Sequence, residues 1–314
     1  MTITNSRPII CAHCGGEVCG AYVQAGSSHY HPFHFVCSVC GRDILEGSYV
    51  EDDGLVYHPG CHEARLAPRC SYCDKPLCGD YREDYWGLRS CIEHEVEFPS
   101  CVFCGRMVDS RRHGGSASRG GVRCIVCRRA AIEGEREAED LFGETLCWCS
   151  AQTLAFSSRK VFVGLCDKQR ICKMLGKNPA GQHLGVTKTR LLSLWNGAFH
   201  LQSLSVFILR GLPRTLFMGV SAHELGHVWL KQLGIVGLSE QHEEGFCELL
   251  AFRRYHQLKT KEGQFFASQI AGNEDNVYGE GFRAIRSMAA CVGFGGILES
   301  LRAQKRLPII ERVQ

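Results

Sequence analysis

The chain has 314 residues, of which 45% are hydrophobic and 22% are charged, as is ordinary for a globular protein of two or three domains. Its formal net charge of +3 hides a split, because residues 1–127 carry 12 Lys and Arg against 15 Asp and Glu. This acidic balance argues against a nucleic-acid-binding surface in that part of the chain.

The 20 cysteines predict zinc sites rather than disulfides. Met1–Ile10 lacks the basic segment and apolar core of a signal peptide. The most apolar run, Leu204–Val220, is interrupted by Arg210, Pro213 and Arg214, which excludes it as a bilayer span. We therefore expect a cytoplasmic protein in a reducing compartment, where thiolates bind zinc.

From residue 11 to residue 127, cysteines and histidines fall into pairs with two residues between the members. Each pair forms a tight turn that directs two side chains at one ion, and two pairs complete a tetrahedral zinc shell. The pairs are Cys11/Cys14, His31/His34, Cys37/Cys40, His58/Cys61, Cys70/Cys73, Cys91/His94, Cys101/Cys104 and Cys124/Cys127. Together they predict four structural zinc sites, because each site has a full set of four ligands.

The first four pairs resemble a LIM domain, which has two zinc sites in series. Tyr30-His31-Pro32, Phe35 and Gly54-Leu55-Val56-Tyr57 carry this resemblance beside the ligands. One departure is His34, which stands where LIM domains usually have Cys. The resemblance implies a first site of Cys11, Cys14, His31 and His34 and a second site of Cys37, Cys40, His58 and Cys61.

The next four pairs repeat this plan less regularly and predict a LIM-like domain. Six residues separate His94 from Cys101, where LIM domains have two between their sites. LIM-like domains ordinarily present surfaces to other proteins, so we expect protein partners. The third site would be Cys70, Cys73, Cys91 and His94, and the fourth Cys101, Cys104, Cys124 and Cys127.

The remaining cysteines have no partner at zinc-ligand spacing, and we interpret them as small apolar residues. They are Cys19, Cys78, Cys147, Cys149, Cys166, Cys172, Cys247 and Cys291.

After residue 128 the pattern changes to longer helices and a few strands. We expect strands at Val161–Leu165, Leu184–Leu192 and Leu201–Leu209. Leu201–Leu209 leads into the helix at 213–233, and a resemblance to zinc peptidases, carried by that helix, implies that this last strand is an edge strand that pairs with an extended substrate backbone. The expected helices are Ala130–Phe156, Lys168–Leu175 and residues 213–233, 241–257, 261–271, 279–291 and 294–304.

The stretch Ser221–Trp229, on the helix expected at 213–233, carries the chemistry. His223 and His227 are four residues apart, so they lie one turn apart on one helical face and both imidazoles can bind one Zn²⁺. Glu224 points roughly 100° away around the helix, so it can act on a water molecule as a base.

The segment Gln241–Ala251 resembles the gluzincin metallopeptidases, whose third zinc ligand is a Glu on a second helix. Trp229, two residues past the second His, fits the aminopeptidase branch of that group. The resemblance implies Glu244 as the ligand, with Glu243 as the alternative. Adjacent helical side chains point about 100° apart, so only one of these two glutamates can bind the ion. Glu248, one turn further, either orients a ligand imidazole or is a solvated glutamate.

Four segments in order look like the DA-one-type LIM peptidases, plant ubiquitin-receptor growth regulators: Leu209–Arg214, His223–Trp229, Glu243–Gly245 and Val277–Ala284. Together with the LIM and LIM-like pairs, the match covers about residues 11–307. The resemblance implies a ubiquitin-activated endopeptidase that cleaves components of the ubiquitin system. Ten residues precede Cys11, so we expect the N-terminal ubiquitin-interacting motifs of those proteins to be missing.

The predicted fold class is α+β and multidomain. Two zinc-ribbon-type modules, a LIM domain at 8–66 and a LIM-like domain at 67–130, precede a mainly helical zincin-like (gluzincin) metallopeptidase domain with a small β-sheet at 131–314. Residues 131–156 are expected to be its linking helix.

The predicted function is that of a zinc-dependent endopeptidase with one catalytic and four structural Zn²⁺. Glu224 acts as general base beside the ion that the two histidines and Glu244 hold. The tetrahedral oxyanion needs a second donor, for which Tyr278 is the first candidate and His256 and Arg283 are weaker ones. A packing role for Tyr278 is an equal alternative.

The LIM modules are expected to recruit or regulate protein substrates and partners, ubiquitin-system proteins among them, with no nucleic acid and no membrane. The alternative function is a non-catalytic LIM adaptor with a pseudo-peptidase domain. The presence of Glu224 favours the enzyme, because its loss would mark a pseudoenzyme.

Overall fold

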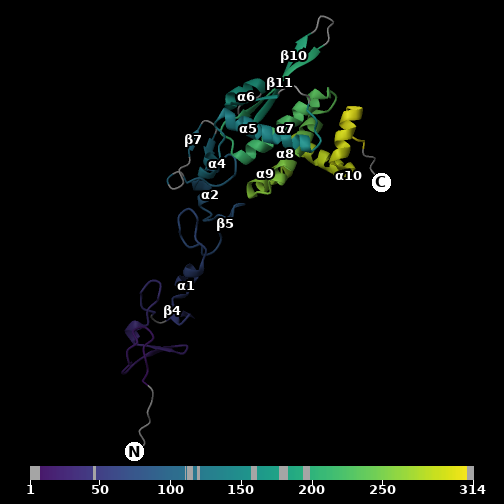
Figure 1. The fold of residues 1–314 in the computed structure, drawn as a ribbon. Coiled ribbons are helices and arrows are strands. Elements are labelled where there is room, and N and C mark those ends of the chain that lie inside the picture. The colour runs from purple at the N-terminus through teal and green to yellow at the C-terminus, as the bar shows by residue number, and fades with distance from the viewer. Residues whose placement is uncertain are drawn as a thin grey trace, which may run out of the picture. The chain divides into compact units, whose positions relative to one another are not determined.

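The structure is a computed structural model that describes residues 8–44, 47–109, 111, 116–118, 121–156, 161–176, 183–193 and 199–309. Residues 1–7, on which part of the prediction about the N-terminus rests, lie outside the described residues. The chain divides into two compact units, Met1–Phe98 and Pro99–Gln314 (Figure 1). This boundary falls between the third and fourth predicted zinc sites. The domain boundaries predicted after residues 66 and 130 stay predictions.

The first unit consists of short hairpins and turns. The hairpins are β1 (Val23–Ala25) with β2 (Ser28–Tyr30), β3 (Val50–Asp52) with β4 (Leu55–Tyr57), and β5 (Arg82–Glu83) with β6 (Arg89–Ser90). They are joined by a 3-10 turn, η1 (Pro32–His34), and by helices α1 (Pro59–Leu66) and α2 (His94–Glu97).

The core of the LIM part is small. Tyr30, Phe35, Val56 and Tyr57 are buried together beside the ligand cysteines, and the rings of Tyr30 and Phe35 meet edge to face at 5.4 Å. A core of this size supplies little of the free energy of folding, so we expect this unit to depend on bound metal for its stability.

The second unit contains a three-stranded sheet in the order β10-β11-β9. β11 (Phe199–Leu209) is central, since it pairs in parallel with β9 (Val161–Cys166) and antiparallel with β10 (Gly185–Ser193). The prediction that Leu201–Leu209 forms an edge strand is therefore wrong. Its side chains explain why, because Leu204, Val206 and Ile208 are buried and the strand carries hydrogen bonds on both sides.

A hairpin of β7 (Ser116–Ser118) and β8 (Gly121–Arg123), then α4 (Ile125–Arg129), opens this unit. The next helix, α5, spans Glu135–Ala151 and is shorter than the predicted Ala130–Phe156. Ala130–Ile132 cannot join it because this stretch hydrogen-bonds to the backbone before α7, with Ile132 N donating to Leu212 O at 2.9 Å.

The remaining helices are α6 (Lys168–Leu175), α7 (Arg214–Gln232), α8 (Glu240–Leu258), α9 (Lys261–Ala271) and α10 (Tyr278–Gln304). Local sequence sets their ends. Ser239 and Thr260 cap α8 and α9, since their hydroxyls accept from His242 N and Gly263 N. The break predicted between the helices at 279–291 and 294–304 is confirmed, because α10 consists of two helical stretches that meet at Gly293, whose backbone is not helical (φ 75°, ψ 158°).

α7, which carries His223, Glu224 and His227, packs closely against α8, and α8 packs closely against α10, as the green and yellow helices of Figure 1 show. α8 and α10 touch at Gly245 and Gly281, where a Cβ on Gly245 would lie 2.3 Å from the backbone of Gly281. Trp229 on α7 stacks on Phe246 of α8, with ring centroids 5.7 Å apart. These contacts hold α8 between α7 and α10, and Glu244 precedes Gly245 on this helix.

α10 is the one helix within the described ranges that is long and apolar enough to cross a bilayer. This test uses length and composition alone, and 22% of the most apolar stretch of α10 is buried in the chain. Core helices of soluble proteins pass the same test, so it decides nothing here. The α+β multidomain class, with zinc modules ahead of a mostly helical unit containing a small sheet, is confirmed.

Candidate active site and metal centres

Each of the four predicted zinc-ligand sets comes together in the structure. Within each set, one ligand atom of every residue lies within 4.8 Å of all the others. The sets are Cys11, Cys14, His31, His34; Cys37, Cys40, His58, Cys61; Cys70, Cys73, Cys91, His94; and Cys101, Cys104, Cys124, Cys127.

The ligand distances in these sets fit a tetrahedral Zn²⁺. Zn–S bonds of about 2.3 Å and Zn–N bonds of about 2.0 Å put two sulfurs about 3.8 Å apart, a sulfur and a nitrogen about 3.6 Å, and two nitrogens about 3.3 Å. Cys73 and Cys91 Sγ are 3.7 Å apart, and His31 and His34 Nδ1 are 3.2 Å apart. His34 Nδ1 lies 3.6 Å from Cys11 Sγ, so the residue that departs from the LIM pattern still has ligand geometry.

Backbone amides support the first thiolate of several sets. Burial raises the pKa of the Cys11 thiol, but the backbone N–H groups of His31, Cys14 and His13, together with the side chain of His34, outweigh it and lower the pKa to about 5. The same balance lowers the pKa of Cys37 and of Cys70 to about 6. Thiolates are the form that binds zinc, so these turns are already suited to metal.

The second unit contains a further cluster on α7. His223 and His227 lie one turn apart, with ring centroids at 5.1 Å. Both rings direct Nε2 at the same carboxylate oxygen, Glu244 Oε2 of α8, which is 3.1 Å from His223 Nε2 and 3.5 Å from His227 Nε2. The predicted set His223, His227 and Glu244 is therefore brought together.

This cluster fits a metal ion better than a set of hydrogen bonds. Glu244 Oε2 is buried and accepts no hydrogen bond. Ligand atoms bound to one Zn²⁺ at about 2.0–2.1 Å in tetrahedral directions lie about 3.3 Å apart, which matches both distances to Glu244. Three lone pairs converging on one point indicate a cation site with two histidines and a carboxylate as ligands.

Two other carboxylates of α8 hold the far sides of the imidazoles. Glu248 Oε1 lies 3.2 Å from His223 Nδ1, and Glu243 Oε1 lies 2.8 Å from His227 Nδ1. Each ring that donates its Nδ1–H to a carboxylate keeps its Nε2 lone pair for a metal. Glu248 thus lies where it can orient His223, and Glu243 does for His227 what sequence reasoning assigned to Glu248 alone.

The carboxylates of Glu244 and Glu248 make the cluster favourable for positive charge. Burial lowers the pKa of His223, but Glu244 and Glu248 outweigh it, so the pKa lies well above its ordinary value. The Glu244 carboxyl also desolvates on burial, yet both imidazoles hold its pKa well below the usual range. A divalent cation would take the place of this shared positive charge.

Cys247 is an unforeseen neighbour of the cluster. Its Sγ and one ring nitrogen each of His223 and His227 lie within 4.8 Å of one another, although the side chain is fully buried. Cys247 and Glu244 are thus rival third ligands. Glu244 is favoured because its buried oxygen has no other partner and because carboxylate completes the usual His₂Glu catalytic zinc site.

Glu224 lies beside the cluster and is held from the edge strand. Thr187 Oγ1 of β10 lies 2.7 Å from Glu224 Oε2 and donates to it. Gly185, two residues earlier, leaves the space that the carboxylate occupies, because a Cβ there would lie 2.6 Å from Glu224 Oε1. Glu224 is only 4% exposed, so its surroundings hold the carboxylate in place.

A cleft of about 1680 Å³ in the second unit opens onto these groups. His223, Glu224 and Glu248 line it, together with Gly185 of β10 and Tyr278 at the start of α10. Burial and the nearby Glu244 carboxylate raise the pKa of Tyr278, so its hydroxyl stays a donor at neutral pH. His256 and Arg283, the other candidates, do not line this cleft.

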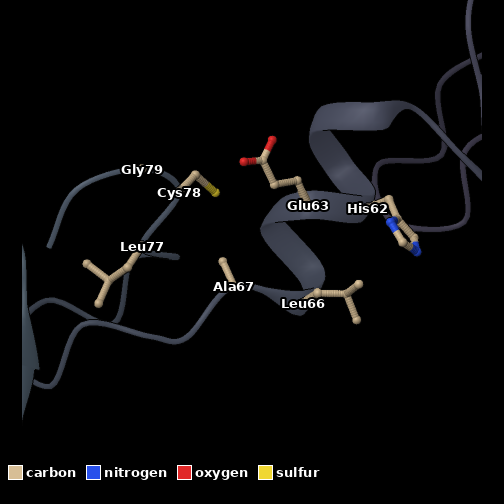
Figure 2. Close-up of a pocket in the computed structure, with 7 residues that line it drawn as sticks. All are labelled: His62, Glu63, Leu66, Ala67, Leu77, Cys78 and Gly79. Carbon is tan, nitrogen blue, oxygen red and sulfur yellow. The ribbon is translucent and has the colours of Figure 1, made fainter.

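The first unit has a smaller hollow of about 440 Å³, and none of the residues that line it is a member of a predicted ligand set. Figure 2 shows Cys78 and Glu63 on opposite sides of it, between α1 and the loop at Leu77–Gly79. Leu66, which also lines it, is 63% exposed. The cluster of His223, Glu224 and Glu248 lines the large cleft of the second unit instead.

Sequence reasoning missed Glu243 as a support, Cys247 as a neighbour of the metal cluster, and Thr187 as a partner of Glu224. The first two lie on α8 beside predicted residues, and only the rotation of α8 about its axis decides which face meets α7. Thr187 is 37 residues before Glu224 and had no motif to mark it.

Comparisons with known proteins match both parts of the chain. A LIM domain profile matches residues 11–66, and a DA1-like profile, described as Protein DA1, matches residues 157–257. Protein DA1 of Arabidopsis thaliana is 24% identical over 96% of this chain and 68% of its own length. LIM domain-containing protein HDR3 of Oryza sativa subsp. japonica is 24% identical over 96% of this chain and 74% of its own. PDZ and LIM domain protein 7 of Mus musculus is 37% identical over 24% of this chain and 17% of its own.

Proposed function

Because the chain combines a LIM domain with a DA1-like domain, we propose that it is a zinc-dependent endopeptidase acting on protein substrates. One observation carries this proposal. The Nε2 atoms of His223 and His227 converge on a buried, unpartnered oxygen of Glu244, while Glu224 on the same helix lines the same cleft. This is the arrangement of a hydrolytic zinc site, with three protein ligands and a carboxylate base.

When bound there, Zn²⁺ supplies a Lewis acid that polarises a carbonyl and makes a water molecule more acidic. Glu224 accepts the proton of the attacking water at its carboxylate and passes it to the leaving amine. Thr187 holds this carboxylate through Oε2, so Oε1 is the oxygen that we assign to proton transfer. Glu243 and Glu248 keep both imidazoles in the tautomer that leaves Nε2 free for the ion.

Tyr278 is the proposed donor to the oxygen that becomes negative during the reaction. It lines the cleft with His223, and Asp275 fixes its backbone, because Asp275 Oδ1 accepts from Tyr278 N at 2.9 Å. A neutral phenol adds a hydrogen bond where negative charge develops, which stabilises the transition state.

The edge strand β10 is the proposed binding place for the substrate backbone. Gly185 lines the cleft next to Glu224, and within the described residues β10 pairs with β11 only. An extended polypeptide can therefore add to the outer edge of β10 by main-chain hydrogen bonds. Binding through main-chain groups suits protein substrates of varied sequence.

The LIM modules are the proposed means of bringing substrates or regulators to the peptidase. LIM domains generally mediate protein–protein interactions, and we propose proteins of the ubiquitin system as the first partners to test. We also propose a cytoplasmic, reducing location, because all 20 cysteines are free of disulfides.

The experiment compares wild type with Glu224→Gln on an unfolded protein substrate, with zinc content measured in both. We expect cleavage by wild type, its loss on treatment with a chelator, and a fall of at least about 100-fold in Glu224→Gln at unchanged zinc content. Equal cleavage by both forms would refute the role of Glu224. No cleavage by zinc-loaded wild type would favour a non-catalytic LIM adaptor.

A further inference from the structure

The active-site cleft has a wall that does not belong to the helical part of the unit. Cys101, Val102, Phe103 and Gly105, from the first turn of the fourth zinc set, line the same cleft as His223 and Glu224. The zinc-binding turn is thus a surface that a substrate in the cleft would meet.

A backbone hydrogen bond and the side chain of Arg123 connect this turn to the segment that leads into α7. Val102 N donates to Val122 O of β8 at 3.0 Å, so the turn is tied to the β8 strand. The next residue, Arg123, donates from Nη1 to Gly211 O at 3.2 Å and lies 3.7 Å from Glu133 Oε1.

Backbone hydrogen bonds add a second attachment just after the fourth zinc set. Arg214 N donates to Ala130 O at 2.8 Å, and Gly211 N donates to Ile132 O at 2.8 Å. Since α7 begins at Arg214, the zinc turn and the metal-binding helix share one rigid connection. The wall therefore has a fixed position relative to His223.

The surface of the wall is apolar where it meets the cleft. Val102 is 39% exposed although it lies beside a buried ligand, and Phe103 is half-buried. An apolar surface that remains partly in water gains free energy when another apolar side chain covers it. The occupant with access to this position is the polypeptide bound in the cleft.

We propose that the Cys101–Cys104 turn is a specificity-determining part of the peptidase, which holds a bulky apolar side chain of the substrate against Val102 and Phe103. This inference rests on the proposed function and names a substrate preference for it. The fourth zinc ion then has two roles, since it stabilises its own module and shapes the substrate cleft.

The test uses the full-length, zinc-loaded protein and a set of peptides in which one Phe is moved through the positions on both sides of the cleaved bond. Wild type should prefer Phe over Ser at one position by roughly 10- to 100-fold in kcat/KM, as expected for burial of an aromatic side chain. Val102→Ser with Phe103→Ser should lose most of this preference, through a rise in KM for the Phe peptides.

Val126→Ser is the matched control. Val126 belongs to the same zinc module and is 44% exposed, but it does not line the cleft. We expect Val126→Ser to keep the wild-type preference, and Phe103→Leu to retain most of it. Zinc content of each variant shows whether the module is intact.

The inference is overturned if the double variant, with its zinc complete, keeps the wild-type preference, or if wild type prefers no apolar residue at any position. If no peptide is cleaved, the proposed function fails on its own account. Binding of the same peptides to Glu224→Gln, measured by fluorescence anisotropy, then decides the inference, because the Phe preference must still depend on Val102 and Phe103.

Discussion

At the scale of single residues, the three carboxylates of α8 have three positions around two imidazoles. Glu244 faces both Nε2 atoms, Glu248 holds His223 Nδ1, and Glu243 holds His227 Nδ1. Consecutive glutamates point about 100° apart, so Glu243 and Glu244 can reach opposite sides of one ring only because α8 crosses α7 at this point.

The role of Glu243 leads to the first prediction. Glu243→Ala removes the acceptor that orients His227, and supports of this kind are worth about 10- to 100-fold in metal affinity. We expect the zinc dissociation constant of this site to rise by that factor, with a smaller rise for Glu243→Gln. Competition with a chelator measures it. Glu299→Ala, an exposed carboxylate of α10, serves as control, and an equal effect there would contradict the assignment.

The rivalry between Glu244 and Cys247 leads to the second prediction. Glu244→Ala should lose the zinc ion of this cluster and all cleavage, whereas Cys247→Ala should keep both. Removal of the buried thiol leaves only a small cavity, so its cost is modest stability loss. Metal analysis of the two variants decides the matter, and the opposite pattern would make Cys247 the third ligand.

In the cluster of α7 and α8, the sequence predicts the proposed ligands better than the residues that orient them. A pair of histidines four residues apart marks its own helical face, so His223 and His227 needed no tertiary information. Glu243 and Glu244 are neighbours in sequence, and only the packing of α8 against α7 decides that Glu244 meets both Nε2 atoms while Glu243 meets His227 Nδ1.

At the scale of secondary structure, β10 takes the position that was predicted for β11. Periodicity identifies both runs as strands, but the order of strands depends on which neighbours they find. Since β11 lies between β9 and β10, the sheet edge near Glu224 belongs to β10 in the part of the chain that the structure describes. The same limitation explains α5, because the start of a helical pattern gave no sign that Ala130–Ile132 would pair with Leu212–Arg214.

The position of β10 leads to the third prediction. Thr187→Val keeps the shape of the side chain but removes the donor to Glu224. A lost hydrogen bond to a charged group costs about 1.5–3 kcal/mol, so we expect kcat to fall about 10-fold or more at unchanged zinc content. Thr189→Val, an exposed threonine of the same strand, should be neutral. Full activity of Thr187→Val would separate β10 from the chemistry.

At the scale of the whole molecule, the fourth zinc set belongs with the helical unit. The compact unit begins at Pro99, and Arg123, Ala130 and Ile132 bind the segment that enters α7. Cysteine spacing predicts the ligand sets of the third and fourth sites, but it carries no information on the surfaces that these sites contact.

This arrangement leads to the fourth prediction. A fragment Pro99–Gln314 should fold, bind two zinc ions and cleave short peptides, because it keeps the fourth zinc set and its contacts. A fragment of residues 131–314 loses them and should be markedly less stable to heat or urea. Equal stability and activity of the two fragments would show that the fourth zinc set is separate from the peptidase.

The central claim is that one zinc ion, held by His223, His227 and Glu244, works with Glu224 to hydrolyse peptide bonds. The most direct measurement returns zinc to protein from which the most accessible ion has been removed, and follows cleavage of an unfolded protein. Activity should rise in proportion and level off at one equivalent in wild type, while Glu224→Gln takes up the same equivalent and stays inactive. Cleavage before zinc is returned, or equal cleavage by Glu224→Gln, would contradict the account.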